Sequence, residues 1–450
     1  MNRKRIFIIA FLLFLLLSGC TSRVLLPTKS QSKPIPTHAT ASEVPSQTPV
    51  LDEGADMLPE GISVPFMRWI YDTYGADVYH QLMSDFQSDT DGGPLWHDLT
   101  GSSLFVLKDQ FSGILSSPDQ ARFENIWLKE TQSPDEVLLS FAGDVSFADG
   151  YANMASYQLK GGIDQCILKE VRERMAAADI MMVNNEFCYS KRGTPLAGKA
   201  FTFRADPSMV QNLNTLSVDV VSVANNHVYD YGPEALLDTL DTLSDAGIAY
   251  AGAGRDIKEA ANPVYFIAGG MKISYVCATE IERSTRFTKG ADLQNPGVLR
   301  TDSSDYLAAV DTAKANSDFV VVFMHWGTEG TNYFANDQQT IARQLIDHGA
   351  GLVIGCHPHV LQGIEYYRDV PIVYSLGNFW FNSKTIPTGL IEAVITPKGL
   401  QNLKFIPCLQ KNCETSLLPI SDQKRDAIHF LNQLSPGVSI DEQGTIIQSP

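Results

Sequence analysis

The sequence predicts an α/β protein in which layered sheets are flanked by helices and preceded by a small, mainly helical N-terminal region. From residue 137 onwards, short apolar runs rich in Val, Ile and Phe recur, as is typical of strands buried on both faces. Helical stretches lie between several runs, and this alternation indicates a layered α/β domain over residues 137–408. The predicted helices span 164–178, 233–246, 304–315 and 337–348, and a predicted hairpin turns at Gly269-Gly270.

Length and composition are those of a folded protein with an acidic exterior. The chain has 450 residues, of which 44% are hydrophobic and 19% are charged, so it can bury a sizeable core. Its formal net charge of −17 argues against nonspecific binding to nucleic acid, and we expect no nucleic-acid partner. An anionic substrate would need a local cation, such as a metal, to hold it.

The first twenty residues are typical of an export signal. A basic start precedes an apolar run from Ile6 to Leu17. This run is shorter than a typical transmembrane helix and fits the core of a signal peptide. The ending Leu-Ser-Gly-Cys resembles a lipobox, which implies cleavage before Cys20 and lipidation of its thiol. The alternatives are a plain membrane anchor or an ordinary secretory signal. The lipobox predicts a protein held by its lipid on the extracytoplasmic side of the cell membrane.

The remaining boundaries follow from changes in composition. Residues 21–58 form a predicted disordered tether, because 21–50 contain five Ser, five Thr and five Pro and no aromatic residue. Residues 59–136 are predicted to be mixed and partly helical, and 409–450 to be a C-terminal extension.

The cysteines give little indication of function. The seven cysteines contain no CxxC pair, which disfavours a sulfur-ligated zinc site. Cys408 and Cys413 are spaced so that they could close a small loop, although pairing cannot be deduced from sequence.

Polar residues of a restricted kind follow the apolar runs. The carboxyl ends of parallel strands are where open α/β sheets place their ligands. Asp, Glu and His are uncommon in cores unless they are paired or bind metal, so the pattern predicts a metal site. Oxygen and imidazole ligands without thiolate suit Mn, Fe or Zn better than Mg alone, and the number of candidates allows two metals. These run ends are Gly143-Asp144, Asn184-Asn185-Glu186, Asn225-Asn226-His227, His325-Trp326-Gly327, His357-Pro358-His359 and Gly377-Asn378.

Six motifs in order resemble the bacterial capsule-synthesis protein CapA family over about residues 137–390. They are GDVSF, NNEF, SVANNHVYDYG, MHWGTEG, GCHPHVLQG and YSLGNF. Members of this family take part in synthesis of the poly-γ-glutamate capsule. The family is similar in fold to the calcineurin-like metallophosphoesterases, which have layered sheets, outer helices and a two-metal centre at the strand ends.

The resemblance implies a role for each matching residue. His227 matches a general acid, and Glu186 stands where the superfamily uses a bridging Asp. Two departures concern the metals: Ser146 replaces a His of the first motif, and Glu186 is one methylene longer than Asp. One metal therefore has fewer protein ligands than usual. The implied metal ligands are Asp144, Glu186, Asn226, His325, His357 and His359.

The sequence leaves two possible roles for Asp230 open. It follows His227 by three residues and could orient the imidazole, as a carboxylate often does. It could equally cap the helix that begins near Pro233.

Three further residues are candidate substrate contacts, each with an alternative. Asn378 could hydrogen-bond either a ligand His or the substrate. Glu329 could line the site or be a solvated loop carboxylate. Trp326 could be a stacking platform or a wall.

The sequence thus predicts a lipoprotein of CapA type that acts in synthesis or export of an anionic capsule polymer such as poly-γ-glutamate. The predicted chemistry is metal-assisted hydrolysis or transfer at a phosphoester or γ-glutamyl amide, with one or two divalent metals. The alternatives are an extracellular metal-dependent phosphodiesterase or nucleotidase, and a non-catalytic assembly factor of a membrane capsule synthase. The expected partners are the membrane, through the lipid, capsule-synthase subunits and the anionic polymer.

Overall fold

The computed structural model describes residues 58–59, 61–87, 93–282, 287–419 and 422–449. The predicted signal peptide, the lipidation residue Cys20 and the tether up to residue 57 lie outside these ranges. Within these ranges, none of the helices has the length and apolar character needed to cross a membrane.

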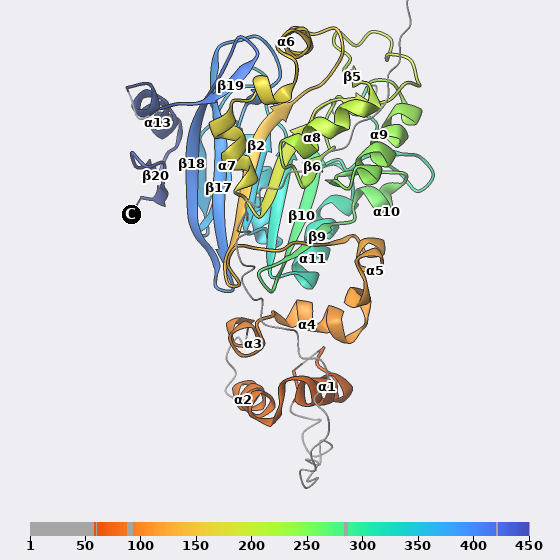
Figure 1. The fold of residues 1–450 in the computed structure, drawn as a ribbon, viewed down its shortest axis with the longest axis vertical. Coiled ribbons are helices and arrows are strands. Elements are labelled where there is room, and N and C mark those ends of the chain that lie inside the picture. The colour runs from red at the N-terminus through yellow and green to blue at the C-terminus, as the bar shows by residue number, and fades with distance from the viewer. Residues whose placement is uncertain (1–57, 60, 88–92, 283–286, 420–421, 450) are drawn as a thin grey trace, which may run out of the picture. The chain divides into compact units, whose positions relative to one another are not determined.

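Two large sheets form the centre of the protein, as the layered α/β prediction requires (Figure 1). We call them sheet 1 and sheet 2. Sheet 1 has the strand order β19 (Glu414–Leu417), β18 (Gly399–Lys411), β17 (Ile386–Thr396), β2 (Val137–Val145), β3 (Ile180–Asn185), β6 (Val220–Ser222) and β7 (Ala249–Ala251), with β16 (Asn378–Trp380) paired to β2. Sheet 2 has the order β1 (Ile126–Leu128), β9 (Val264–Ala268), β10 (Met271–Thr279), β12 (Phe319–His325), β13 (Leu352–Cys356), β15 (Val370–Val373) and β14 (Ile364–Tyr367).

Side chains alternate between the two faces of each strand, and both faces are buried, which explains why the runs are apolar throughout. In β3, Met182 points into the core between the sheets, whereas Met181 and Val183 point to the opposite face. In β12, Phe323 points inward and Met324 outward in the same way. Both faces of these strands are therefore buried, one against the other sheet and one against helices.

Helices cover the outer face of each sheet. The outer face of sheet 1 packs on α6 (Ala152–Lys160), α7 (Lys169–Ala176), α8 (Gln211–Thr215) and α9 (Pro233–Asp245). The outer face of sheet 2 packs on α11 (Asp305–Asn316) and α12 (Asn336–Asp347), with α10 (Ile257–Ala260) at its side. The predicted helices 233–246, 304–315 and 337–348 are thus confirmed to within one residue at each end. The predicted helix 164–178 is shorter, because α7 begins only at Lys169.

The N-terminal region is mainly helical, as predicted. Its helices are α1 (Val64–Tyr74), α2 (Ala76–Gln87), α3 (Gly93–Thr100), α4 (Leu104–Phe111) and α5 (Pro118–Phe123). Its last part, β1, joins the edge of sheet 2 beside β9.

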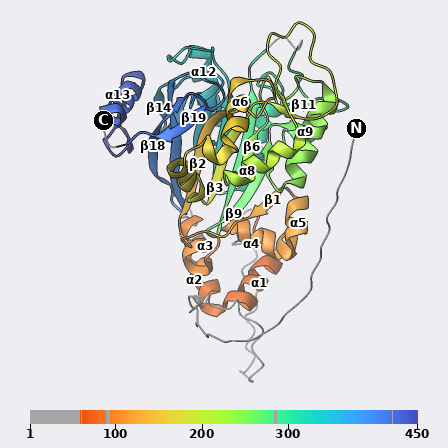
Figure 2. The ribbon, with the colours of Figure 1, turned by 45° about the horizontal axis from the view of Figure 1, so that its top comes forward.

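The predicted hairpin at Gly269-Gly270 joins β9 to β10 and anchors the N-terminal helices. Both glycines have positive φ, +51° and +67°, as a two-residue hairpin turn requires. The Gly269 carbonyl oxygen lies 2.9 Å from Nε2 of His97, and the Gly270 carbonyl accepts the Ser103 amide at 2.7 Å. Lys272, the second residue of β10, forms a 2.6 Å ion pair with Asp109 of α4. In Figure 2 these helices lie at the opposite end of the sheets from α6 and α12.

Sheet 1 continues past the predicted boundary at residue 408. Strand β18 runs to Lys411, and β19 pairs with it after a turn at Asn412 and Cys413, both at positive φ. The chain ends in α13 (Asp422–Leu434) and the hairpin β20 (Val438–Ile440)–β21 (Ile446–Gln448), which add apolar residues to the core between the sheets. Cys408 and Cys413 do not close the small loop that their spacing allows, since all six described cysteines have free thiols.

Replacing Gly270 with Ala should loosen the docking of the N-terminal helices. A Cβ there would lie 2.1 Å from the Gly101 carbonyl oxygen, in addition to the strain of positive φ. Gly399 is a matched control, because its φ is +96° but a Cβ would meet nothing within 4 Å. We expect Gly399→Ala to lower the free energy of unfolding by about 1–2 kcal/mol. Gly270→Ala should cost about 1–3 kcal/mol more. Urea unfolding measures both, and equal losses would contradict the docking role.

Candidate metal centre

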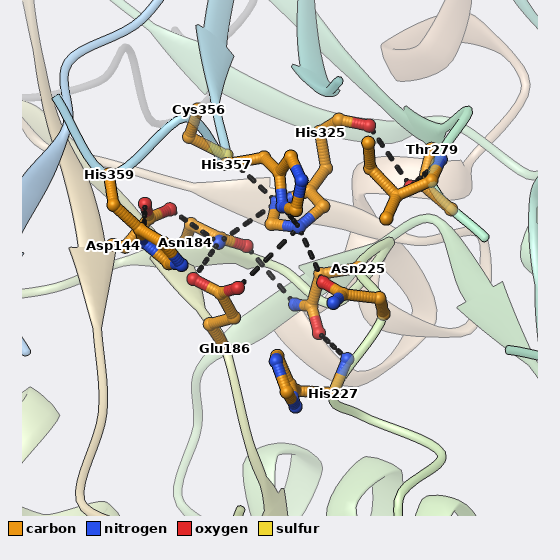
Figure 3. A network of polar contacts seen from close by, with 12 residues as sticks. Asp144, Asn184, Glu186, Asn225, His227, Thr279, His325, Cys356, His357 and His359 are labelled. Carbon is orange, nitrogen blue, oxygen red and sulfur yellow. Dashed lines mark hydrogen bonds and ion pairs between the residues drawn. The ribbon is translucent and has the colours of Figure 1, made fainter. Parts of the chain in front are cut away.

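The predicted ligands converge at the carboxyl ends of strands from both sheets. Strands β2, β3 and β6 are parallel neighbours in sheet 1, and β12 and β13 are parallel neighbours in sheet 2. Figure 3 shows that the side chains following these strands point toward one another. The structure brings together Asp144, Glu186, Asn226, His325, His357 and His359.

A glycine and an irregular register place Asp144 at this point. The pairing of β2 with β3 shifts between Phe141 and Asp144, so that Asp144 lies opposite Asn184. The Asp144 amide donates to the Gly377 carbonyl at 2.9 Å. A Cβ on the preceding Gly143 would lie 1.8 Å from that same carbonyl oxygen, so only glycine allows this approach.

Three potential ligand atoms surround Nε2 of His325. The Asn226 Oδ1 atom lies 2.8 Å from it and the His357 Nδ1 atom lies 3.0 Å from it. Oε1 of Glu186 lies 3.6 Å from it. Amide oxygen, imidazole nitrogen and carboxylate oxygen are the donors that Mn, Fe and Zn accept in proteins.

A second group of ligand atoms contains Asp144, Glu186 and His359. Nδ1 of His359 lies 3.1 Å from Oδ2 of Asp144 and 2.8 Å from Oδ1 of Asn378. Of the two alternatives for Asn378, the structure therefore favours contact with a predicted ligand His. Glu186 belongs both to this group and to the group with His325 and His357. It occupies the shared position that a bridging carboxylate requires.

Burial favours the neutral imidazole, the form in which His binds metal, at His325 and His357. Desolvation lowers the pKa of His325 well below its usual range, and the positive charges of His357 and His359 act in the same direction. Desolvation, with the His359 charge, lowers the pKa of His357 to about 3. For His359, burial would lower the pKa, but the hydrogen bond and charge of Asp144 outweigh it and raise the pKa.

The pKa shifts and hydrogen bonds of the two buried carboxylates, Asp144 and Glu186, indicate whether a cation fits between them. Burial would raise the pKa of Asp144, but the hydrogen bond and charge of His359 lower it. Burial and then the charge of Asp144 raise the pKa of Glu186 well above its usual range. Oε1 of Glu186 is buried and has no hydrogen-bond partner among the described residues. An unpaired buried carboxylate oxygen is costly, and a divalent cation between the two groups would satisfy it, so the residues fit a metal.

The loop after β13 is strained where it delivers its two histidines. His357 has φ +97° and His359 has φ +60°, values that residues with a Cβ rarely adopt. Strain of this kind persists only where the surrounding structure enforces it, and it clusters at functional sites.

His227 and Asp230 form a buried pair beside this cluster. Nδ1 of His227 lies 2.6 Å from Oδ2 of Asp230. Oδ1 of Asp230 forms a 2.8 Å ion pair with Lys199. Helix α9 is capped by Gly232 and not by a side chain, so the structure favours the orienting role of Asp230. Burial lowers the pKa of His227, although the charge and hydrogen bond of Asp230 oppose that shift.

The two remaining candidate substrate contacts, Trp326 and Glu329, do not lie among the candidate metal ligands. Trp326 is fully buried in the outer face of sheet 2, where its Nε1 donates to the Tyr374 carbonyl at 2.8 Å. The stacking-platform alternative is therefore wrong, because Trp326 directly follows His325, the last residue of β12, and its side chain points to the opposite face. Glu329 is exposed, and its charge acts to raise the pKa of both Glu186 and His359.

Ser146, which replaces the expected His, does not contact the cluster. Its hydroxyl accepts the Ala148 amide at 3.3 Å, and its carbonyl accepts Nδ2 of Asn153 at 2.7 Å. The Ser146 hydroxyl is thus engaged by the local backbone, and fewer protein ligands for one metal stays a prediction.

Three further residues are structurally important at the site; Asn184 was among the polar run ends in the sequence, whereas Lys199 and Cys356 were given no role there. Asn184 donates to Oδ1 of Asp144 at 2.8 Å and accepts from Asn225 at 3.1 Å, so it links two strand ends. Lys199 ion-pairs with Asp230, and it comes from a loop with no apolar run to mark it. Sγ of Cys356 lies 3.2 Å from Nδ1 of His325. Its position directly before His357 was the signal that could have identified it.

Replacing His325 with Ala should remove most of the bound divalent metal and leave the fold largely intact. Nε2 of His325 faces Asn226, His357 and Glu186, so the loss of His325 removes the central ligand of this group. Metal content by atomic spectroscopy and far-UV circular dichroism measure the two effects. His348→Ala is the control, because His348 lies at the end of α12 and pairs with Asp311 away from the site. Unchanged metal content in His325→Ala would contradict the assignment.

Comparison with known proteins agrees with the motifs. The chain is 32% identical to the capsule biosynthesis protein CapA of Bacillus anthracis, over 48% of this chain and 54% of that protein. It is 31% identical to the PGA biosynthesis protein CapA of Bacillus subtilis, over 62% of this chain and 73% of that protein. The chain thus spans about half the length of the first relative and about three quarters of the second.

Solved structures are more distant. The Haemophilus influenzae NAD nucleotidase matches 68% of this chain and 57% of its own, with 13% identity and a TM-score of 0.36. A likeness at this level is no guide to activity. The family model of the bacterial capsule synthesis protein PGA_cap matches residues 138–383, which include all six candidate metal ligands. The chain therefore belongs to the bacterial capsule synthesis protein family.

Proposed function

We propose that this protein is a metal-dependent enzyme that acts in synthesis or export of an anionic capsule polymer such as poly-γ-glutamate. Its reaction is hydrolysis or transfer at a γ-glutamyl amide or a phosphoester. The relatives named for capsule and PGA biosynthesis support the process. The observation that carries the chemistry is the shared Glu186 between two groups of potential ligands, with the His227–Asp230 pair alongside.

The metal centre would supply the positive charge that an anionic substrate needs in order to bind an acidic protein. When bound there, a divalent metal polarises the electrophile and makes a water molecule more acidic. Asp144, Glu186, Asn226, His325, His357 and His359 would hold it. With a formal net charge of −17, the chain otherwise repels an anionic polymer, so a local cation is what brings such a substrate to this site.

His227 is arranged to move a proton. As a neutral imidazole it donates Nδ1–H to Asp230, which leaves Nε2 free to take up a proton. Asp230 stabilises the imidazolium that then forms, and Lys199 holds the second oxygen of Asp230 in place. Nε2 can then deliver the proton to the leaving group, which is the general-acid role.

A second candidate function is that of a non-catalytic assembly factor for a membrane capsule synthase. The position of Ser146 favours it, because the group with Asp144 and His359 lacks the fourth side chain that the family motif supplies. In this case the metal would stabilise the loops or bind the polymer, and His227 would be dispensable.

Replacing His227 with Ala decides between these two functions. In the enzyme, loss of the proton donor should lower turnover by about 10²–10⁴-fold, while metal content stays near that of the wild type. The assay is a panel of phosphoesters and γ-glutamyl peptides with Mn, Fe or Zn. His348→Ala again serves as the control. Full capsule output in the cell from His227→Ala, with no turnover on the panel by the wild type, would support the assembly factor. Full turnover by the variant would show that His227 is not the proton donor.

We also propose that the protein is a lipoprotein anchored by Cys20. The Leu-Ser-Gly-Cys sequence that ends the apolar run supports this proposal. Cys20→Ala should abolish lipidation and release the protein from the membrane fraction. Mass spectrometry of the mature N-terminus measures the change. A wild-type protein that is cleaved elsewhere and carries no lipid would refute the anchor.

A further inference from the structure

The metal-binding role of His325 constrains which of its nitrogens carries the proton. A neutral imidazole has one N–H and one free lone pair, and only the nitrogen with the lone pair binds metal. Nε2 of His325 faces Asn226, His357 and Glu186, so Nδ1 must carry the hydrogen. A ligand His normally donates this hydrogen to an acceptor that fixes its tautomer.

Two polar groups lie close to Nδ1 of His325, and they differ in whether they can accept a hydrogen bond. Nδ2 of Asn184 lies 3.3 Å away, but an amide NH₂ only donates. Its orientation is fixed, because it also donates to Oδ1 of Asp144 at 2.8 Å. Sγ of Cys356 lies 3.2 Å away, and a thiol sulfur can both donate and accept. Cys356 is therefore the group that can receive the Nδ1 hydrogen.

The backbone fixes Cys356 in this position. It ends β13 directly opposite His325 in the parallel register with β12. Its carbonyl accepts the Trp326 amide at 3.1 Å, and its side chain is fully buried. A residue held on a strand in this way controls the ring orientation of its neighbour more tightly than a loop residue would.

We propose that Cys356 is a positioning residue that holds the His325 imidazole in the tautomer presenting Nε2 to the metal. This inference rests on the proposed metal-dependent function. Without Cys356, the hydrogen-bonding group that remains within reach of Nδ1 among the described residues is the Asn184 NH₂, and two donors repel each other. The imidazole would then favour the other tautomer, in which Nδ1 accepts from Asn184 and Nε2–H donates to Asn226. That tautomer cannot bind metal through Nε2.

The rival role is direct ligation by the sulfur, because Asp144, His325 and Cys356 also place ligand atoms near one another. Ligation requires the sulfur itself to bond the metal, and a thiolate bound to Co²⁺ gives an intense charge-transfer absorption. A positioning thiol leaves no such band.

The test compares the full-length wild type with Cys356→Ala and Cys356→Ser, loaded with Co²⁺ or Zn²⁺. Affinity is measured by competition with a chelator, and the His325 tautomer by ¹⁵N shifts of the Zn²⁺-loaded protein. We expect Cys356→Ala to weaken binding by about 10–100-fold, as the loss of such a hydrogen-bond partner typically does. Cys356→Ser, whose hydroxyl also donates and accepts, should restore most of the affinity. Cys408→Ala is the matched control, a buried free thiol in β18.

Each outcome has a distinct meaning. A sulfur-to-cobalt band in the wild type that both variants lose would overturn positioning in favour of ligation. Wild-type affinity in Cys356→Ala would show that Cys356 is an ordinary core thiol, while the metal function stands. A wild type that binds neither metal would sink the proposed function and this inference together. Far-UV circular dichroism identifies a variant that has lost affinity by unfolding, and Cys356→Ser then decides.

Discussion

Two buried carboxylates of like charge, Asp144 and Glu186, set the constraint on which the site depends. Each lies at the end of a central strand of sheet 1, fully removed from solvent. Hydrogen bonds from Asn184 and His359 stabilise Asp144, but one oxygen of Glu186 has no such partner among the described residues. Burying two negative charges together is unfavourable, and either a proton on Glu186, whose pKa is raised, or a cation between the two groups relieves the repulsion. The neutral imidazoles of His325 and His357 complete the surroundings that such a cation requires.

The two-sheet architecture creates this arrangement by extending the core. Phe141 and Phe323 point into the core between the sheets, and Asp144 and His325 follow them at the strand ends. The site is thus the place where the apolar packing between the sheets gives way to polar side chains. Its ligands come from two rigid sheets, so their spacing is set by strand packing. The N-terminal helices contact the β9–β10 turn, which lies at the amino ends of the parallel strands, remote from this chemistry.

The layers and most site residues could be predicted because they follow from local patterns. Apolar runs gave the strands, and the polar residues that end them gave Asp144, Glu186 and His325. Three-dimensional partners could not be predicted in this way. Lys199 is distant in sequence from Asp230, and nothing local marks the pairing. Stacking by Trp326 was a wrong alternative, because Trp326 directly follows His325 at the end of β12 and strand alternation turns its side chain to the outer face. Cys356 was overlooked because a thiol in an apolar run is usually a core residue.

The two groups of potential ligands are unequal, and if each bound a metal this inequality would set the order in which they fill. The group with more potential ligands, called the richer group, contains His325, His357, Asn226 and Glu186. The other group has Asp144, His359 and the shared Glu186, and Ser146 stands where a further ligand His is expected. A cation in the richer group would neutralise Glu186 first and weaken its repulsion of Asp144. Asp144 would then rely on the hydrogen bonds from Asn184 and His359, which it already has. The second position therefore gains less from a metal, and we expect it to fill at higher metal concentration than the first.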